Sequence, residues 1–317
     1  MEELFSGLLG KHEKLGVRLR HVDFDVSTSG KRIKVRGNYP AFRDGTPQLD
    51  ELLEAVHQRI VPFCLPRKEI KKVYEEAKQL EPEEAAIAYT SLVKKATDLF
   101  IKAKKGDTRS GEAGEIVLFL LNEWVLKAPQ IVSKMYLKTN TNMPVHGTDG
   151  IHGKYDNAEK TLHLYWGESK AYKNLSGALA AALKSISEFH SKNQQKREIE
   201  IVSDYLDLGD ATTDEREAII AYLDPYNEAS NARKTYFSCL LVFAFSHPKD
   251  PNLDDAQLEQ KFITNFKAEA KNFLEGLPDR MKKADLQNIN FEFFLLPVEN
   301  AEGFRDKFQA LIGWPNA

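Results

Sequence analysis

The 317-residue sequence is poor in cysteine and lacks any long apolar run. Its two cysteines, Cys64 and Cys239, have no CxxC spacing, which argues against a thiolate zinc site or a redox pair. So few cysteines are typical of a reducing compartment. No apolar run approaches the ~18–20 residues of a membrane span, and the N-terminus lacks the cationic segment and apolar run of a secretory signal. The sequence therefore predicts a soluble, cytoplasmic protein with no membrane partner.

Several motifs of common enzyme classes are also missing. The sequence has no Walker A motif, no GxGxxG and no Ser-His-Asp pattern, so it gives no support to an ATPase, a dinucleotide enzyme or a serine hydrolase. No nucleotide cofactor is therefore expected on this chain. Internal repeats and low-complexity segments are absent as well. Hydrophobic residues make up 42% and charged residues 29%, which is typical of a globular protein with a substantial core.

The net charge of −3 hides an uneven distribution along the chain. Between Lys11 and Arg43, nine basic residues face only three acidic ones, and a second basic cluster lies within residues 94–110. Between Glu198 and Glu228, ten acidic residues face one basic residue. A nucleic-acid binder needs local cationic surface rather than a basic average. The charge pattern is therefore compatible with a DNA partner, although solvated helix faces also explain such clusters.

The first third of the chain predicts a hairpin followed by helices. Residues 16–26 and 31–39 alternate apolar and polar side chains around a Ser/Thr/Gly turn, as hairpin strands do. Helices are expected over 49–60, 67–80 and 83–103. The run of glycine and polar residues at 106–111 is the first strong break. We place a domain boundary there, between an N-terminal region, residues 1–105, and a second domain, residues 106–317.

The second domain alternates helices and strands. This order predicts an α/β fold with a mixed central sheet and helices on both faces. The expected elements are a buried helix over 112–126, a strand over 131–138, a hairpin of 149–155 and 161–170, a helix over 175–190, an acidic helical insertion, a strand over 235–245, a helix over 254–275, a strand over 289–297 and a helix over 301–312.

The central hairpin carries the residues that suggest chemistry. Because residues two apart in a strand share a face, Glu168 and Lys170 end an otherwise apolar face that includes Trp166. If residues 157–160 form the turn, residue i pairs with residue 317 − i, and Asp149 lies directly opposite Glu168. Side chains so opposed have Cβ atoms about 4.5–5.5 Å apart. Two carboxylates this close need a divalent cation or a shared proton.

Oxygen donors with few nitrogen or sulfur competitors favour Mg²⁺ or Mn²⁺. Glu112 and Glu115 begin the buried helix and share one helical face. We expect Glu115 to be the one that faces the metal, although the choice between the two stays open. Acidic residues and a lysine around a metal suit phosphodiester hydrolysis, because the metal polarises the phosphoryl oxygen and lowers the pKa of bound water. Lys170 is then placed to hold or deprotonate the attacking water.

Three segments in this order, GEAGE at 111–115, MPVHGTDGIHG at 143–153 and LYWGESKAY at 164–172, carry a resemblance to known nucleases. The set of Glu115, Asp149 and Glu168-Ser169-Lys170 resembles the PD-(D/E)xK, or restriction-endonuclease-like, superfamily. Threonine replaces the proline that precedes the aspartate in the superfamily pattern. More closely, the sequence resembles the HamA family, the nuclease subunits of the Hachiman anti-phage defence system.

The resemblance implies a metal-dependent deoxyribonuclease that a partner helicase, HamB, restrains and that phage infection releases. It implies metal binding by Asp149 and Glu168, assisted by Glu115 and the carbonyl of Ser169, with Lys170 acting on the water. The N-terminal region is expected to dock the helicase or DNA. Tyr172 and Lys173 follow the ExK motif and are expected to contact DNA phosphates. A second possibility is an inactive nuclease-like adaptor that binds DNA and a helicase.

Each of these residues also has a structural interpretation. Asp149 between two glycines fits an Asx turn, and Glu168 with Lys170 fits a surface ion pair. Glu115 fits a helix N-terminus that favours negative charge.

The histidines and large aromatic side chains invite other functional interpretations. His152 and His163 have the opposite strand parity to Asp149 and Glu168, so packing or DNA contact is preferred over a zinc site. Trp124, Trp166 and the run 291–294 are expected in the core.

Overall fold

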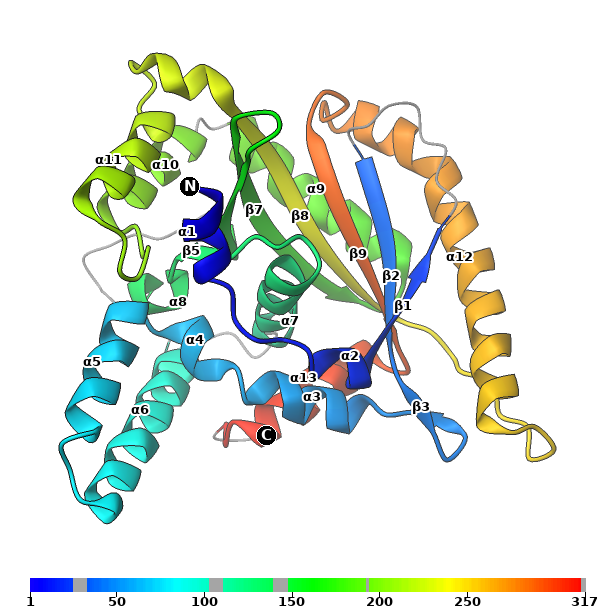
Figure 1. Ribbon diagram of the computed structural model, residues 1–317. Coiled ribbons are helices and arrows are strands. Elements are labelled where there is room, and N and C mark those ends of the chain that lie inside the picture. The colour runs from blue at the N-terminus through cyan, green and yellow to red at the C-terminus, as the bar shows by residue number, and fades with distance from the viewer. Residues whose placement is uncertain (25–32, 103–110, 139–147, 192–193, 315–317) are drawn as a thin grey trace.

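A seven-stranded mixed sheet forms the centre of the molecule, as the computed structural model shows (Figure 1). The structure describes residues 1–24, 33–102, 111–138, 148–191 and 194–314. This architecture confirms the predicted α/β class with helices on both faces. In spatial order the strands are β1 (Leu19–Asp23), β2 (Ile33–Pro40), β9 (Asn290–Val298), β8 (Arg233–Ala244), β7 (Thr161–Tyr172), β6 (Gly150–Asp156) and β5 (Gln130–Val132).

The middle of the sheet is parallel and its two margins are antiparallel. Strands β2, β9, β8 and β7 run parallel to one another. Strand β1 pairs antiparallel with β2, and β6 pairs antiparallel with both β7 and β5. Strands β8 and β9 are apolar and buried over most of their length. Such continuous apolar runs are expected where helices cover both faces of a parallel sheet.

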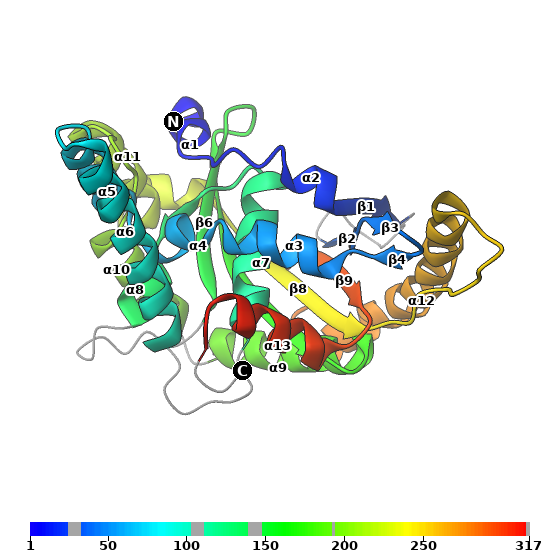
Figure 2. The ribbon, with the colours of Figure 1, turned by 90° about the horizontal axis from the view of Figure 1, so that it is seen from below.

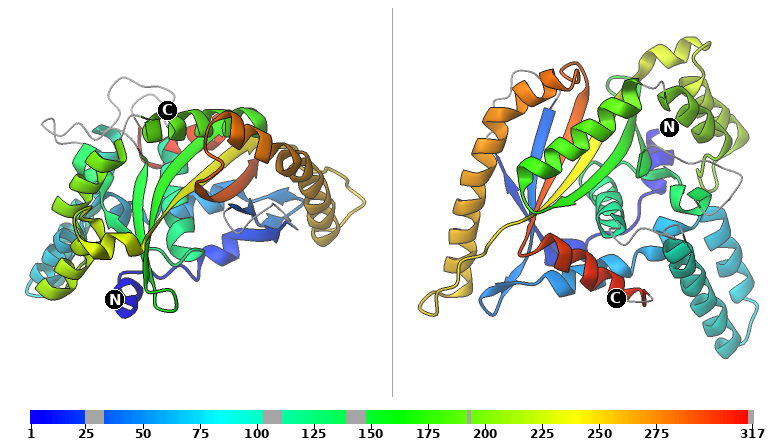
Figure 3. Two further views of the ribbon diagram at one scale, coloured as in Figure 1. Left: turned by 90° about the horizontal axis from the view of Figure 1, so that it is seen from above. Right: turned by 180° about the vertical axis from the view of Figure 1, so that it is seen from behind.

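Helices cover the sheet on both sides (Figures 2 and 3). On one face, α9 (Leu175–Ser191) and α12 (Asp255–Lys283) pack in a core that contains Leu164 and Trp166. On the other face, α7 (Glu112–Trp124), α13 (Ala301–Leu311) and α3 (Leu49–His57) pack in a core that contains Tyr165. The predicted alternation of β7 side chains between two faces is therefore confirmed.

The N-terminal hairpin is part of the central sheet, because β2 lies beside β9 with Ile33 opposite Phe291. Two cationic side chains of this region are ion-paired: Arg18, just before β1, binds Glu51, and Arg36 on β2 binds Glu292. These ion pairs neutralise part of the positive charge seen in the sequence. The predicted boundary between residues 105 and 106 lies outside the described residues. The remaining elements of this region are α1 (Glu2–Gly7), α2 (Leu15–Arg18), β3 (Phe42–Arg43), β4 (Thr46–Pro47), α4 (Ile60–Cys64), α5 (Arg67–Ala77) and α6 (Pro82–Lys102).

Two predicted strands are wrong in part. The strand expected over 16–26 begins only at Leu19, after the short helix α2. The strand expected over 131–138 ends at Val132, and residues Lys134–Lys138 form helix α8. The reason is a missing partner: Val132 pairs with Ile151, and β6 begins only one residue before Ile151. Beyond that point no strand within the described ranges lies beside β5 to bond its backbone.

The acidic segment between β7 and β8 is helical, as predicted. It contains α10 (Gln194–Asp204), α11 (Thr213–Leu223) and the short 3₁₀ helix η1 (Glu228–Ala232). A capping box of Thr212 and Glu215 starts α11, so part of the negative charge satisfies backbone N–H groups. Among the described helices, none combines the length and the apolar character that crossing a membrane requires.

Candidate active site

The β6–β7 hairpin has the predicted register. Gly150 lies opposite Gly167, and Asp156 lies opposite Thr161, so paired residue numbers sum to 317 along the whole ladder. Asp149 immediately precedes Gly150, and its amide donates to the carbonyl of Gly167 at 2.8 Å. The two-residue side-chain period then puts Asp149 beside Glu168 on one face.

The Asp149 carboxylate reaches across to the neighbouring strand. Its Oδ2 accepts a hydrogen bond from the backbone N–H of Ser169 at 2.7 Å. An Asx turn joins a side chain to a backbone group two residues further along the chain, whereas this bond joins residues twenty apart. The contact therefore favours the site interpretation of Asp149 over the turn interpretation.

Glu168 and Lys170 form an ion pair at the edge of the core. Lys170 Nζ lies 2.5 Å from Glu168 Oε1, and the two side chains are 27% and 4% exposed. This burial distinguishes the pair from a solvated surface ion pair. Burial by itself lowers the pKa of Lys170, but the charges of Glu168 and Asp149 outweigh it and hold that pKa above its usual value. Lys170 is therefore an ammonium group at neutral pH when no metal is bound.

Cys239 on β8 lies opposite Glu168 in the β7–β8 ladder and is buried. Burial raises the pKa of its thiol well above the usual value, and the nearby Glu168 and Asp149 carboxylates raise the pKa further. The thiol is therefore protonated when no metal is bound. The neighbouring Asp149 and Glu168 offer carboxylate oxygens, the hard ligands that suit Mg²⁺ or Mn²⁺.

Helix α7 contacts the same strand from the opposite face. A Cβ added to Gly114 would lie 2.0 Å from the Ser169 Oγ, so this close approach requires glycine unless the serine side chain shifts. Glu115 follows directly and is 8% exposed. The structure thus brings together Asp149, Glu168 and Lys170, and it places Glu115 on the helical turn that abuts Ser169. A ligand role for Glu115 stays a prediction, and the Glu112 side chain lies outside the described residues.

His152 is a packing residue, in line with its strand parity. Its Nδ1–H donates to the Ala128 carbonyl at 2.9 Å. Burial lowers the pKa of His152 to about 4. A neutral, hydrogen-bonded imidazole in the core needs no ligand to explain it.

His163 belongs to a cluster with Asp156 and Glu159 at the far end of the hairpin, the one group of three potential metal-binding side chains in the described parts of the chain. Asp156 already accepts two backbone N–H groups of the turn. Glu159 binds Lys234 at 2.5 Å. These contacts explain the cluster without a metal ion, because they stabilise the turn of the β6–β7 hairpin.

A cavity of about 520 Å³ opens beside the ExK motif. Lys170, Tyr172 and Lys173 of β7 and its following loop line it together with Arg305 and Glu302 of α13. Over the described residues, neither Lys173 nor Arg305 has an acidic partner within ion-pair distance. Sequence reasoning missed Arg305, because its position beside β7 depends on packing between segments about 130 residues apart.

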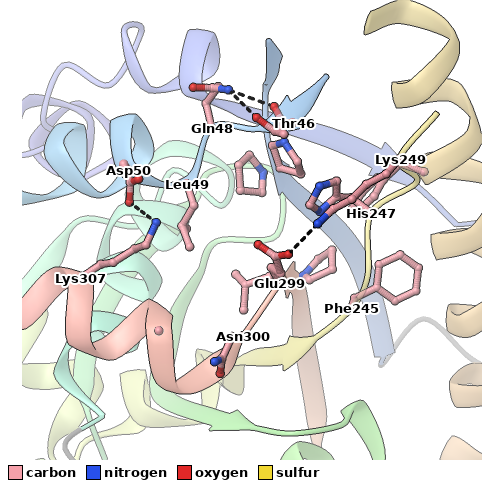
Figure 4. Close-up of a pocket in the computed structure, with 16 residues that line it drawn as sticks. Thr46, Gln48, Leu49, Asp50, Phe245, His247, Lys249, Glu299, Asn300 and Lys307 are labelled. Carbon is pink, nitrogen blue, oxygen red and sulfur yellow. Dashed lines mark hydrogen bonds and ion pairs between the residues drawn. The ribbon is translucent and has the colours of Figure 1, made fainter. Parts of the chain in front are cut away.

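A second cavity, of about 330 Å³, differs in its charges (Figure 4). Its lysines are paired: Lys307 lies 2.6 Å from Asp50, and Lys249 lies 3.5 Å from Glu299. The cavity beside the ExK motif therefore offers the more available positive charge for a phosphate group.

Comparison with known proteins gives one family match. Residues 17–312 match a family model described as HamA, which is nearly the whole chain and includes every site residue described above. No curated protein matches the chain.

Proposed function

Because the chain belongs to the HamA family, we propose that it is a divalent-metal-dependent deoxyribonuclease of Hachiman antiviral defence. Membership in this family itself suggests the defence role. The observation that carries the nuclease proposal is the convergence of Asp149, Glu168 and Lys170 at one end of the β6–β7 hairpin. An anionic pair with one ammonium group suits a metal-assisted attack on a phosphodiester.

In this proposal Asp149 and Glu168 hold Mg²⁺ or Mn²⁺. The Ser169 carbonyl assists, since N–H and C=O of one strand residue point to the same side and the Ser169 N–H points to Asp149. Glu115 of α7 is the proposed further oxygen donor, and it would have to move toward the ion, because the structure does not group its carboxylate with those of Asp149 and Glu168. The ion, when bound, polarises the phosphoryl oxygen and lowers the pKa of its water. Closely placed carboxylates are compatible with such an ion, because it relieves their repulsion.

In this proposal Lys170 orients the attacking water and does not deprotonate it. The two carboxylates raise the pKa of Lys170, so it stays an ammonium group that donates hydrogen bonds at neutral pH. Lys170 is one of the residues that line the 520 Å³ cavity. From there the ammonium is placed to hold a water or a phosphate oxygen for in-line attack.

We propose DNA as the substrate and the HamB helicase as the partner that delivers it and restrains cutting. The N-terminal region remains the proposed docking surface. The net charge of −3 supports dependence on a partner, because phosphate contacts dominate DNA affinity.

The proposal is tested with supercoiled plasmid DNA and the purified chain, with and without the helicase and ATP. Nicking or degradation is expected with Mg²⁺ or Mn²⁺ and is expected to stop with EDTA. Plasmid that stays intact under all of these conditions, with the helicase bound to a folded chain, would support the inactive adaptor instead.

Removing Lys173 and Arg305 is expected to weaken DNA binding without changing the chemistry of the site. In the variant Lys173→Ala/Arg305→Ala, each lost phosphate contact should reduce the slope of log K against log salt by about 1. Fluorescence anisotropy with labelled duplex at several salt concentrations measures this slope. The cavity beside the ExK motif supplies both side chains.

Lys307→Ala is the matched control for this prediction. Lys307 lies on the same helix as Arg305 but is paired with Asp50. The Lys307→Ala variant should leave the DNA affinity and the slope of log K against log salt unchanged. Equal slopes for the wild type and the double variant would show that this cavity does not bind DNA.

A further inference from the structure

Lys134 is a fully buried charged residue close to the site. Its side chain is 1% exposed, and its Nζ lies 2.7 Å from Glu198 Oε2, whose side chain is 2% exposed. Glu198 belongs to α10 in the acid-rich segment, and Lys134 opens α8. The pair therefore joins two helices that lie outside the central hairpin.

The Lys134 ammonium also binds the residue that precedes Asp149. Nζ donates to the Thr148 carbonyl at 2.7 Å and to the Thr148 Oγ1 at 3.1 Å. The ammonium therefore has two hydrogen-bond acceptors on Thr148 and the charge of Glu198 beside it. Thr148 is itself 4% exposed. The main chain is thus held from both sides, by Lys134 at residue 148 and by Gly167 through the amide of Asp149.

Fold stability does not by itself explain this ion pair. Replacing a buried ion pair with well-packed apolar residues is often neutral or stabilising, whereas removing one partner strands a charge in the core. A buried charged pair is better explained by the hydrogen bonds that its ammonium group donates. Here the Lys134 ammonium binds Thr148, two residues before β6 begins, and so fixes the main chain next to Asp149.

We propose that Lys134, charge-balanced by Glu198, is a positioning residue for the Asp149 carboxylate. The inference rests on the proposed metal-dependent function and adds to it a residue outside the acidic set and the ExK motif. With Thr148 fixed, Asp149 meets a metal ion in a prepared position. Without Lys134, the ion must order that segment itself, so the defect appears in metal affinity.

The decisive variant is Lys134→Met/Glu198→Met, which removes both charges together. Lys134→Met alone is expected to lower the melting temperature, because it leaves Glu198 buried without its partner. The double variant should recover that melting temperature. It should still bind Mn²⁺ about 10- to 100-fold more weakly than the wild type, as is usual when a residue that supports a metal ligand is lost.

Two measurements separate positioning from a merely structural role. Calorimetric titration of Mn²⁺ into the protein without DNA reports the metal affinity directly. Plasmid cleavage against Mg²⁺ concentration should show a shifted midpoint with a maximal rate close to that of the wild type. A structural defect would instead lower the rate equally at every Mg²⁺ concentration.

Arg36→Met/Glu292→Met is the matched control. This ion pair also lies in the sheet with buried carboxylate oxygens, but it joins β2 to β9. It should leave the Mn²⁺ affinity unchanged. A Lys134→Met/Glu198→Met variant with wild-type Mn²⁺ affinity and Mg²⁺ midpoint would overturn the positioning role alone. A wild-type chain that neither binds Mn²⁺ nor cleaves DNA would overturn the proposed function, and the positioning role with it.

Discussion

The variant Glu168→Gln is expected to lose DNA cleavage by more than about 100-fold, since loss of a residue that only supports a metal ligand already costs 10- to 100-fold. Glutamine keeps the size of the side chain and removes the negative charge that holds the ion. Glu168 is also the closest acidic partner of Lys170, at 2.5 Å. Loss of the Glu168 carboxylate therefore removes a proposed metal ligand and also frees the Lys170 ammonium from its ion pair.

Two measurements are needed for Glu168→Gln: plasmid cleavage with Mg²⁺, and calorimetric titration of Mn²⁺. Both should fall together. Glu292→Gln is the control, because Glu292 is likewise buried on a central strand and ion-paired, with Arg36 on β2. The nuclease proposal would be contradicted if both variants cleaved DNA at the wild-type rate.

The variant Lys170→Met is expected to separate metal binding from catalysis. Cleavage should fall about 10²- to 10³-fold, the usual cost of one catalytic donor. Metal binding should be no weaker than in the wild type, because the ammonium that competes for Glu168 is gone. The two carboxylates then repel each other until an ion binds, so Mg²⁺ should raise the melting temperature of this variant more than that of the wild type.

Calorimetric titration of Mn²⁺ and thermal melting with and without Mg²⁺ check the first part, and plasmid cleavage checks the second. Lys173→Met is a useful comparison, since Lys173 lines the same cavity but does not bind Glu168. Full cleavage by Lys170→Met would contradict the proposed role of Lys170. Loss of Mn²⁺ binding would show instead that Lys170 supports the metal site structurally.

The central hairpin could be predicted well because its determinants are local. The short turn at 157–160 sets the register, and the two-residue alternation sets the faces. Both hold in the structure, where Gly150 faces Gly167 and Asp149 bonds across to Ser169. The class of fold followed equally from the order of helical and strand patterns.

Sequence patterns were less informative where the partner is distant. The segment 131–138 has strand-like alternation, yet it becomes a helix after Val132 because β6 offers no further backbone to pair with. The N-terminal hairpin was expected in a separate region, and its β2 strand lies against β9, more than 250 residues away. Neither outcome can be read from propensity, which describes only neighbouring residues.

The amino-acid sequence by itself determined the acidic pair and lysine, their shared strand face and the family to which the chain belongs. Only the tertiary structure decided that Lys134 and Glu198 hold the residue before Asp149, and that Arg305 lines the cavity beside Lys170. The physical reason is the range of the interactions. Strand alternation and turn length act over a few residues, whereas buried ion pairs and cavities form only when distant segments pack together.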